Sequence, residues 1–496
     1  MHAEIIKAIT DIEQAFDTST LTTRGVSYWP ICRQKLWGGL MRKLLAARGE
    51  GDPPPVSNTG PQWADVGQVN AALAGPQDLG LLTATPARAP QLNPDVLFFA
   101  RPEEYSDKVA GKSYARFIDS VFAHAVAAGP ATKIELADAR VIGFVRRYPS
   151  LFLDLGMAGQ DVTFDPPGPL ENFADVAAAA AKYADGFVLD HEALATDMGK
   201  IFYFAAIFEK ILRALKPRLF ILSVSYHPVG NAWMLACRRA GVRSVDLQHG
   251  RLGPIHGNYT HLTVAPPDGY ALLPDRVWCW GEPTKRDIAA FNNPRCTRHM
   301  GVVGGNAWLA KWRHGDLKEL EPPEAPAFVA ATHDKRKILV SLQPLDTPVT
   351  APLIAAMKQA PADWLWLLRL HPLRRQTAPE IKRLLENAGV RNFEIESATT
   401  LPLYLLLRLC EHHVTVFSSV VTEAASFDLR TSLLDEVGAS TFAKYVARGI
   451  CRVTVTGESL VAHVRECLAA GRTPLDDDFV DMRAEAAPQA LAGLLG

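Results

Sequence analysis

The sequence predicts an α/β protein with two parallel-sheet domains of the doubly wound, Rossmann-like kind. Short apolar segments typical of buried strands alternate with helical segments, and this alternation occurs twice along the chain. At 496 residues the chain also exceeds what one hydrophobic core usually organises. We therefore expect two such domains facing a cleft, over residues 95–300 and 301–496, after an N-terminal helical extension and irregular linker over residues 1–94.

The composition is that of a soluble globular protein and excludes several other classes. The hydrophobic content is 48% and the charged content 21%, while the formal net charge of -1 argues against a nucleic-acid partner. The seven cysteines show no CxxC spacing, so we expect neither a disulfide framework nor a zinc site. Since no signal peptide or bilayer-spanning segment is recognisable, we expect a cytoplasmic protein, with a peripheral position at the inner membrane as the alternative.

The N-terminal extension contains two segments with helical periodicity, near residues 3–16 and 30–48. The second carries an apolar stripe surrounded by basic side chains and is compatible with two roles: it can pack into the core, or it can lie on an anionic membrane surface. Residues 50–93 are rich in proline, glycine and polar residues, which predicts an irregular connection. The stripe consists of Leu36, Trp37, Leu40, Met41, Leu44 and Leu45.

The first domain is organised around a βαβ unit. An apolar strand over Leu219–Ser225 is followed by a helix over Asn231–Ala240 and a strand over Ser244–Leu247, with Gly241 as the helix stop. His227 and His249 follow the two strands, and the loops at the carboxyl ends of parallel strands are where such proteins bind ligands. A histidine there is either an acid–base group or a structural residue that bonds loop carbonyls.

The segment LLRLHPLRR is the first of two motifs in the second domain. It predicts a buried strand that ends at His371 and Pro372, with Arg369, Arg374 and Arg375 around this end. An imidazole close to guanidinium groups suits a phosphate. A turn histidine with surface arginines is the structural alternative.

The second motif, TVFSSVVTEAA, runs from an apolar strand directly into Ser418 and Ser419, and a helix follows. Hydroxyl groups and unpaired backbone N–H groups at that position favour an anion. Glu423 could accept hydrogen bonds from a ribose diol, or it could serve only as a capping glutamate. Together the two motifs favour a nucleotide-binding face.

The RLHP and FSSVVTEA segments resemble the donor-binding half of GT-B glycosyltransferases that use cytidine nucleotides. These include bacterial sialyltransferases, Kdo transferases and CDP-glycerol polymer transferases. DLQHG followed by LPDRVWCWGE is similar to transferases of bacterial capsule and O-antigen gene clusters, and the resemblance spans residues 95–436. The chain lacks the acidic-acidic-glycine motif that supplies the base in several sialyltransferases, so the base role passes to a histidine.

The resemblance implies a metal-independent GT-B glycosyltransferase of capsule or lipopolysaccharide assembly. Its donor would be a CMP- or CDP-linked Kdo-like or sialic-acid-like sugar, or a polyol phosphate, and no further cofactor is expected. The acceptor would be a lipid-linked glycan or an oligosaccharide, and residues 30–48 are the candidate membrane contact. The alternatives are an enzyme like the sugar-nucleotide 2-epimerases and a non-catalytic carbohydrate-binding assembly factor.

The expected site residues fall into three groups. His249 is the base, with His227 as second choice. Ser418, Ser419, His371, Pro372, Arg369 and Glu423 hold the donor. Gln248, Arg251 and Lys112 contact the acceptor, and no residue is assigned to a metal.

Overall fold

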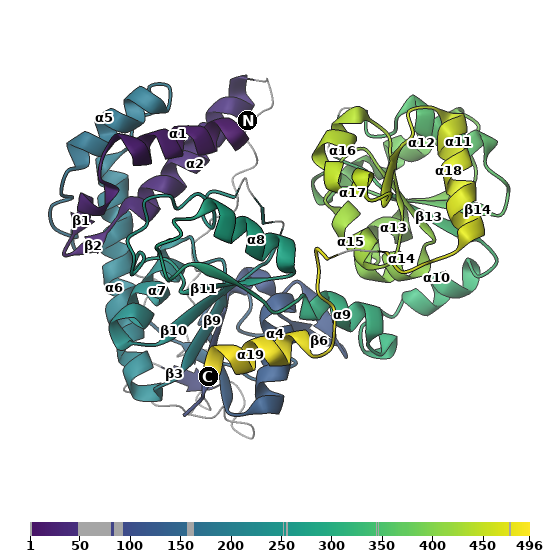
Figure 1. Cartoon of the computed structure of the whole chain (residues 1–496). Coiled ribbons are helices and arrows are strands. Elements are labelled where there is room, and N and C mark those ends of the chain that lie inside the picture. The colour runs from purple at the N-terminus through teal and green to yellow at the C-terminus, as the bar shows by residue number, and fades with distance from the viewer. Residues whose placement is uncertain are drawn as a thin grey trace. The chain divides into compact units, whose positions relative to one another are not determined.

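The computed structural model describes residues 2–47, 81–83, 93–155, 163–250, 252–253, 256–343, 345, 347–475 and 478–496. It divides into two compact units (Figure 1). Unit 1 comprises Met1–Trp308 and Asp481–Gly496, and unit 2 comprises Leu309–Val480. Each unit contains a parallel sheet between helices, so the predicted fold of two Rossmann-like domains is confirmed.

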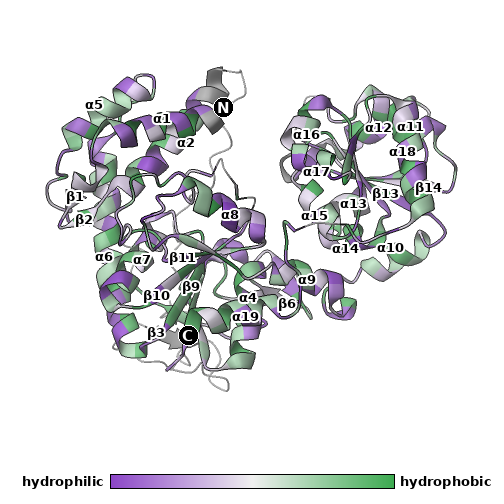
Figure 2. Ribbon diagram, viewed as in Figure 1, coloured by the Kyte–Doolittle hydropathy of each residue, from purple (hydrophilic) through white to green (hydrophobic). Residues whose placement is uncertain are grey.

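Unit 1 is built on an eight-stranded sheet with the order β12-β11-β10-β9-β4-β7-β8-β3. All neighbouring strands run parallel except β3 and β8, which pair antiparallel at one edge. The central strands are apolar and buried on both faces, as Figure 2 shows around β9. The strands are β3 (Leu81–Thr83), β4 (Val96–Ala100), β7 (Ala131–Leu136), β8 (Leu151–Leu153), β9 (Leu219–Ser223), β10 (Arg243–Leu247), β11 (Arg276–Cys279) and β12 (Met300–Val303).

The predicted βαβ unit is confirmed as β9, α7 (Pro228–Ala240) and β10. Pro228 occupies the first helical turn, where its missing N–H group costs nothing. Gly241 ends the helix with a φ of 72°, a left-handed conformation that glycine adopts without strain. These local signals explain why the sequence predicts the unit closely.

The N-terminal helices belong to unit 1. The stripe residues Leu36 and Leu40 are buried in its core, and Trp37 and Met41 pack against the same core. This packing favours the core alternative for the described part of the stripe, while the side chains of Leu44 and Leu45 lie outside the described residues and membrane contact stays a prediction. The expected linker over residues 50–93 lies almost entirely outside the described residues.

The remaining elements of unit 1 cover the sheet or form small additions to it. A short hairpin, β5 with β6, follows strand β4. The elements are α1 (His2–Ala15), η1 (Thr18–Thr20), β1 (Thr22–Thr23), β2 (Val26–Ser27), α2 (Trp29–Ala47), η4 (Pro102–Glu104), β5 (Asp107–Val109), β6 (Lys112–Tyr114), α4 (Arg116–Ala128), α5 (Phe173–Tyr183), α6 (His191–Leu215), α8 (Glu282–Phe291) and α19 (Ala486–Leu495).

Unit 2 contains a six-stranded parallel sheet with the order β15-β14-β13-β16-β17-β18. Its strands are β13 (Arg336–Ser341), β14 (Trp364–Arg369), β15 (Phe393–Glu394), β16 (His412–Thr415), β17 (Thr431–Leu433) and β18 (Cys451–Val453). Its helices are η5 (Leu317–Glu319), α10 (Ala325–Ala331), α11 (Ala351–Gln359), η6 (Pro372–Thr377), α12 (Ala378–Asn387), α13 (Glu396–Thr400), α14 (Leu403–Leu409), α15 (Val420–Ser426), α16 (Glu436–Thr441), α17 (Ala443–Ala447) and α18 (Gly457–Ala470).

The division into units differs from the expected boundary at residue 300 in two places. Residues 300–303 form β12, an edge strand of the eight-stranded sheet of unit 1 (sheet 1). The boundary between the two units falls within α9 (Ala307–His314). The chain also returns to unit 1 at its C-terminal end, where α19 contributes Leu491 and Leu494 to the core beside α4. Among the helices that the structure describes, none combines the length and the apolar character needed to cross a bilayer.

Candidate functional site

In the six-stranded sheet of unit 2 (sheet 2), the direction in which successive strands are added reverses between β13 and β16. From β13 the chain proceeds to β14 and β15 on one side, then crosses back to β16, β17 and β18 on the other. Ser341 at the end of β13 is in register with Arg369 of β14 and with Thr415 of β16. The residues after these positions therefore meet at one edge, at the kind of switch point where doubly wound sheets bind ligands.

This edge brings together the two sequence motifs of unit 2. His371 follows β14, Ser418 follows β16 and Gln343 follows β13. The side-chain oxygen Oε1 of Gln343 accepts a hydrogen bond from the backbone N–H of Phe417 over 2.7 Å, which holds the β13 and β16 loops together. The Ser418 hydroxyl accepts from the N–H of Val420 over 3.3 Å. Ser418 is half-buried and the neighbouring Ser419 is exposed.

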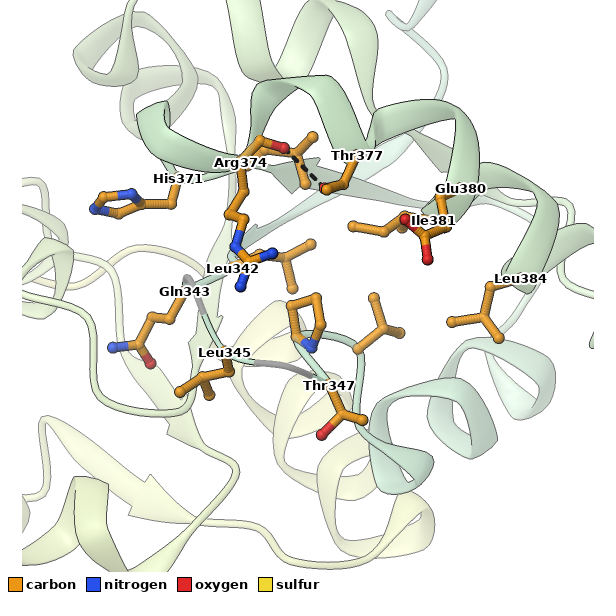
Figure 3. Close-up of a pocket in the computed structure, with 13 residues that line it drawn as sticks. Leu342, Gln343, Leu345, Thr347, His371, Arg374, Thr377, Glu380, Ile381 and Leu384 are labelled. Carbon is orange, nitrogen blue, oxygen red and sulfur yellow. Dashed lines mark hydrogen bonds between the residues drawn. The ribbon is translucent and has the colours of Figure 1, made fainter. Parts of the chain in front are cut away.

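A pocket of about 240 Å³ opens beside this edge (Figure 3). Arg374 extends into it from η6, with the His371 imidazole at one side (Figure 3). Burial lowers the pKa of His371, which favours the neutral ring. The pocket thus combines an apolar floor with a cation and hydrogen-bonding groups. It is lined by Leu342, Gln343, Leu345, Thr347, Pro348, Val349, Leu370, His371, Arg374, Thr377, Glu380, Ile381 and Leu384.

The other expected donor residues lie in different positions. Nη1 of Arg369 donates to the carbonyl oxygens of Ala398 (2.8 Å) and Leu401 (2.6 Å), so this side chain anchors α13 to β14. The structure thus shows a structural role for Arg369, and its contact with the donor stays a prediction. Pro372 begins η6, and Glu423 lies half-buried in the first turn of α15.

Sheet 1 has a corresponding switch point between β4 and β9. The chain leaves β4 toward β7 and β8, then returns to place β9 on the opposite side of β4. Phe98 of β4 is in register with Ile221 of β9, and Ser223 of β9 with Leu247 of β10. The segments that follow these three strands therefore lie at the same edge of the sheet and carry Arg101, Tyr226, His227 and His249.

His249 is held at this edge by both ring nitrogens. Nδ1 lies 3.2 Å from the carbonyl oxygen of Leu247, and Nε2 lies 3.0 Å from the hydroxyl of Tyr226. A carbonyl can only accept, so Nδ1 carries the proton and Nε2 accepts from Tyr226. Burial, with a further contribution from the positive charge of Arg101, lowers the pKa of His249 to about 4. The ring is therefore neutral at pH 7.

His227 caps helix α7. Its Nδ1 accepts a hydrogen bond from the N–H of Gly230 over 3.3 Å, so Nε2 carries the proton. Burial first, and Arg101 second, lower its pKa to about 3. The turn before it contains Val224 at a φ of 61°, which is strained for a β-branched residue. Such strain often marks a functional turn.

The three expected acceptor residues differ in what surrounds them. Gln248 is buried, and its amide accepts from the N–H of Trp280 over 2.7 Å and donates to the carbonyl of Gly250 over 2.9 Å. Gln248 thus holds the loop that carries His249, and its contact with the acceptor stays a prediction. Lys112 is exposed in the β5–β6 hairpin. Arg251 lies outside the described residues.

Sequence reasoning assigned no role to Tyr226 or Gln343. Both directly adjoin strand-end segments already singled out, Tyr226 before His227 and Gln343 in the segment KILVSLQP. Their partners, His249 and Phe417, are distant in the sequence, so no local pattern could reveal these contacts. Within the described part of the chain, no group of three or more His, Cys, Asp or Glu side chains is placed to hold a metal ion.

No family model matches the chain, and no curated protein matches it significantly. Solved structures do match. The UDP-GlcNAc 2-epimerase from Neisseria meningitidis, bound to UDP-GlcNAc, is 12% identical and has a TM-score of 0.50, with 81% of this chain and 98% of that chain covered. The UDP-GlcNAc 2-epimerase from Methanocaldococcus jannaschii is also 12% identical at a TM-score of 0.50, covering 80% and 98%. The two epimerases show that this chain shares their two-domain, GT-B type fold.

Proposed function

We propose that this protein is a glycosyltransferase that moves a sugar from a nucleotide donor to a hydroxyl group of a glycan. One observation supports the proposal: side chains whose chemistry suits a phosphate lie at the switch point of sheet 2, and a neutral imidazole lies at that of sheet 1. Ligands of doubly wound sheets bind at such edges. The donor contacts and the base belong to different units, so binding and turnover can be separated by substitution.

The proposed donor lies against unit 2. The hydroxyls of Ser418 and Ser419, with His371 and Arg374, bind the phosphate, while the apolar pocket receives the nucleoside. Glu423 accepts hydrogen bonds from the ribose diol. Preorganised donors and a guanidinium stabilise the charge that develops on a departing phosphate, which is where a transferase without a metal gains most of its rate.

With a sugar donor, the oxygen of the acceptor hydroxyl attacks the anomeric carbon, the bond from that carbon to the phosphate oxygen breaks, and the nucleotide leaves with the electron pair. With a polyol phosphate donor, the same oxygen attacks the phosphorus that carries the polyol, and CMP leaves with the electron pair of the broken P–O bond. The hydroxyl proton passes to the oxygen of Tyr226 as the Tyr226 proton moves to Nε2 of His249. A base with a pKa of about 4 is weak, but an anionic donor nearby raises the pKa of an imidazole.

The donor nucleotide in this proposal is CMP- or CDP-linked, carrying a Kdo-like or sialic-acid-like sugar or a polyol phosphate. The acceptor is a lipid-linked or oligosaccharide precursor of a surface glycan, modified in the cytoplasm. Calorimetric titration of the full chain with CMP, CDP, UDP and GDP tests the nucleotide. Tightest binding of a cytidine nucleotide supports the proposal. Preference for UDP, whose GlcNAc derivative is bound in the Neisseria structure, would replace cytidine by uridine.

A sugar-nucleotide 2-epimerase is the second candidate, because two solved structures that share the fold at a TM-score of 0.50 are 2-epimerases. Its product would be an epimerised sugar that forms without any acceptor. Mass spectrometry and NMR of the products, with and without acceptor, distinguish the two reactions. Nucleotide-independent glycan binding without turnover would instead indicate a carbohydrate-binding assembly factor.

Replacement of the proposed base tests the transferase mechanism. His249→Ala should lower turnover about 10²–10⁴-fold, the usual cost of losing a general base, while the affinity for nucleotide stays unchanged. His227→Ala should lower it less. His191→Ala, which removes an exposed histidine of unit 1, serves as the control. Near-normal turnover of the His249 variant would overturn the assignment.

A further inference from the structure

An arginine lies at the switch point of sheet 1, and its side chain has no partner among the residues that the structure describes. Arg101 follows β4, the strand beside which the chain reverses direction. Among the described residues, its guanidinium has no hydrogen-bond or ion-pair partner, and its Nε is buried. A half-buried cation is costly to leave unpaired, so an anion supplied from outside would stabilise it.

Within the described part of the chain, the one carboxylate hydrogen-bonded to Arg101 contacts its backbone. Glu104 accepts from the Arg101 N–H over 2.7 Å and from the hydroxyl of Ser223, so both of its oxygens are engaged. Burial raises the pKa of Glu104, while the positive charge of Arg101 acts in the opposite direction. Glu104 therefore completes the turn after β4 and leaves the guanidinium fork available.

A second unpartnered donor lies across the β4–β9 junction. Because Nδ1 of His227 accepts from Gly230, its Nε2 carries a proton, and this buried atom makes no hydrogen bond to the described residues, although the backbone of Val224 acts on the ring and opposes the lowering of its pKa. The Arg101 charge acts on the rings of both His227 and His249, which places all three groups in one electrostatic neighbourhood. Two donors that lack acceptors in the same neighbourhood indicate a missing anion.

The turn that carries His227 is rigidly built. Val224 holds its strained φ of 61°, and the next N–H, of Ser225, is bonded to the buried carboxylate of Asp246 over 2.8 Å. Gly230 packs so closely that a Cβ there would come within 2.5 Å of the Ser225 carbonyl oxygen. The position of the His227 donor is thus set before any ligand arrives, as a preorganised site requires.

We propose that Arg101 and the Nε2–H of His227 form an anion subsite at the β4–β9 junction, which binds a carboxylate or phosphate group carried by the acceptor. The inference rests on the proposed function, and it specifies the acceptor class: an acidic glycan or a phosphorylated precursor. A guanidinium fork can bind either group through two hydrogen bonds. The anion is distinct from the phosphate of the donor, which unit 2 binds.

Binding measurements on the full chain test this subsite without any need for turnover. The probes are inorganic phosphate and D-glucuronate, with D-glucose as the neutral comparison. The native chain should bind both anions and not glucose. Arg101→Gln should weaken anion binding at least tenfold, because charge-assisted hydrogen bonds are lost. Arg213→Gln, which removes an exposed positive charge from α6, should leave it unchanged.

CMP and UDP titrations of the same variants identify the source of the anion. Unchanged nucleotide affinity in Arg101→Gln supports an acceptor group, whereas an equal loss of nucleotide affinity would assign the anion to the donor and overturn the proposal. Failure of the chain to bind any nucleotide would contradict the proposed function. The binding of phosphate and glucuronate could still be interpreted in that case. The proposal would also be overturned if Arg101→Gln kept the anion affinity of the native chain. The same holds if Arg213→Gln weakened anion binding as much as Arg101→Gln.

Nitrogen NMR of the native chain with labelled histidine gives a measurement that does not depend on the folding of a variant. Titration with inorganic phosphate should shift the Nε2–H signal of His227, assigned through His227→Asn, which retains a helix-capping side chain. The signal of the exposed His191 should not move. A stationary His227 signal at saturating phosphate would contradict the subsite.

Discussion

The hydroxyl of Tyr226 lies 3.0 Å from Nε2 of His249, and this contact joins the loops after β9 and β10. Because the opposite nitrogen faces the Leu247 carbonyl, the lone pair of Nε2 is already occupied by the tyrosine proton. A proton from a bound hydroxyl must therefore reach His249 through Tyr226. The tyrosine is as much a part of the proposed proton path as the histidine.

Tyr226→Phe removes this hydroxyl and tests the path. The hydrogen bond stabilises the neutral ring, so its loss should raise the pKa of His249 above its value of about 4. Turnover should fall at least tenfold with nucleotide affinity unchanged. Histidine NMR titration gives the pKa, and Tyr203→Phe, at an exposed tyrosine of α6, is the control. Unaltered turnover would exclude the relay.

Ser418→Ala with Ser419→Ala tests the donor edge. The double variant removes two hydroxyl groups from the proposed phosphate site, and charge-assisted hydrogen bonds contribute about 1.5–3 kcal/mol each. Calorimetry should show at least a tenfold loss of CMP or CDP affinity. Ser440→Ala, at an exposed serine of the same unit, should bind normally. If the folded double variant retains full affinity, the nucleotide binds elsewhere.

The buried histidines of sheet 2 predict sensitivity to acid. His413 lies between the hydroxyls of Thr431 and Ser341, each 3.0 Å from a ring nitrogen, and burial lowers its pKa to about 3. The unfolded chain takes up a proton near pH 6.5, whereas the folded chain does so only near pH 3. Stability should therefore fall progressively as the pH drops below about 6.5.

Denaturant unfolding of the native chain between about pH 7.5 and pH 4.5 measures this dependence. His413→Gln should be less stable at neutral pH but should lose less stability on acidification. His333→Gln, at an exposed histidine, should follow the native profile. A profile for His413→Gln that is parallel to that of the native chain would refute the role of this ring.

One buried ion pair of the N-terminal helices should contribute strongly to the stability of the protein. Arg33 and Glu13 form a salt bridge with side-chain exposures of 2% and 0%, and Arg33 also donates to the carbonyls of Gly257 (2.8 Å) and Thr260 (3.0 Å). Arg33→Met leaves the buried carboxylate without its positive partner, although neighbouring N–H and O–H groups still donate to it, and should cost about 3–5 kcal/mol in the free energy of unfolding.

Two further variants separate the ion pair from the general effect of a lost charge. Arg33→Met combined with Glu13→Leu should recover part of the stability, because no unpaired charge remains. Lys7→Met, which breaks an exposed ion pair with Asp11, should change the free energy of unfolding by less than about 1 kcal/mol. Chemical denaturation measures all three. Equal effects of Lys7→Met and Arg33→Met would contradict the buried role.

The sequence by itself determined the elements and the fold class. The βαβ unit at β9, α7 and β10 was predictable because a buried apolar run, Pro228 and Gly241 act locally. The segments around His371 and Ser418 were predictable as strand ends for the same reason. Even the alternation that implies two parallel sheets depends only on neighbours along the chain.

Only the tertiary structure decided which side chains meet. Periodicity could not tell whether the stripe beginning at Leu36 faces lipid or protein, because the same apolar face suits both. The structure shows that its first part, Leu36 to Met41, packs against the core of unit 1. Periodicity also could not show that the side chains of Gln248 and Arg369 form hydrogen bonds with backbone groups distant in the sequence. Strand order and side-chain reach depend on contacts between residues far apart in the sequence, and the switch points at β4–β9 and β13–β16 exist only once those contacts form.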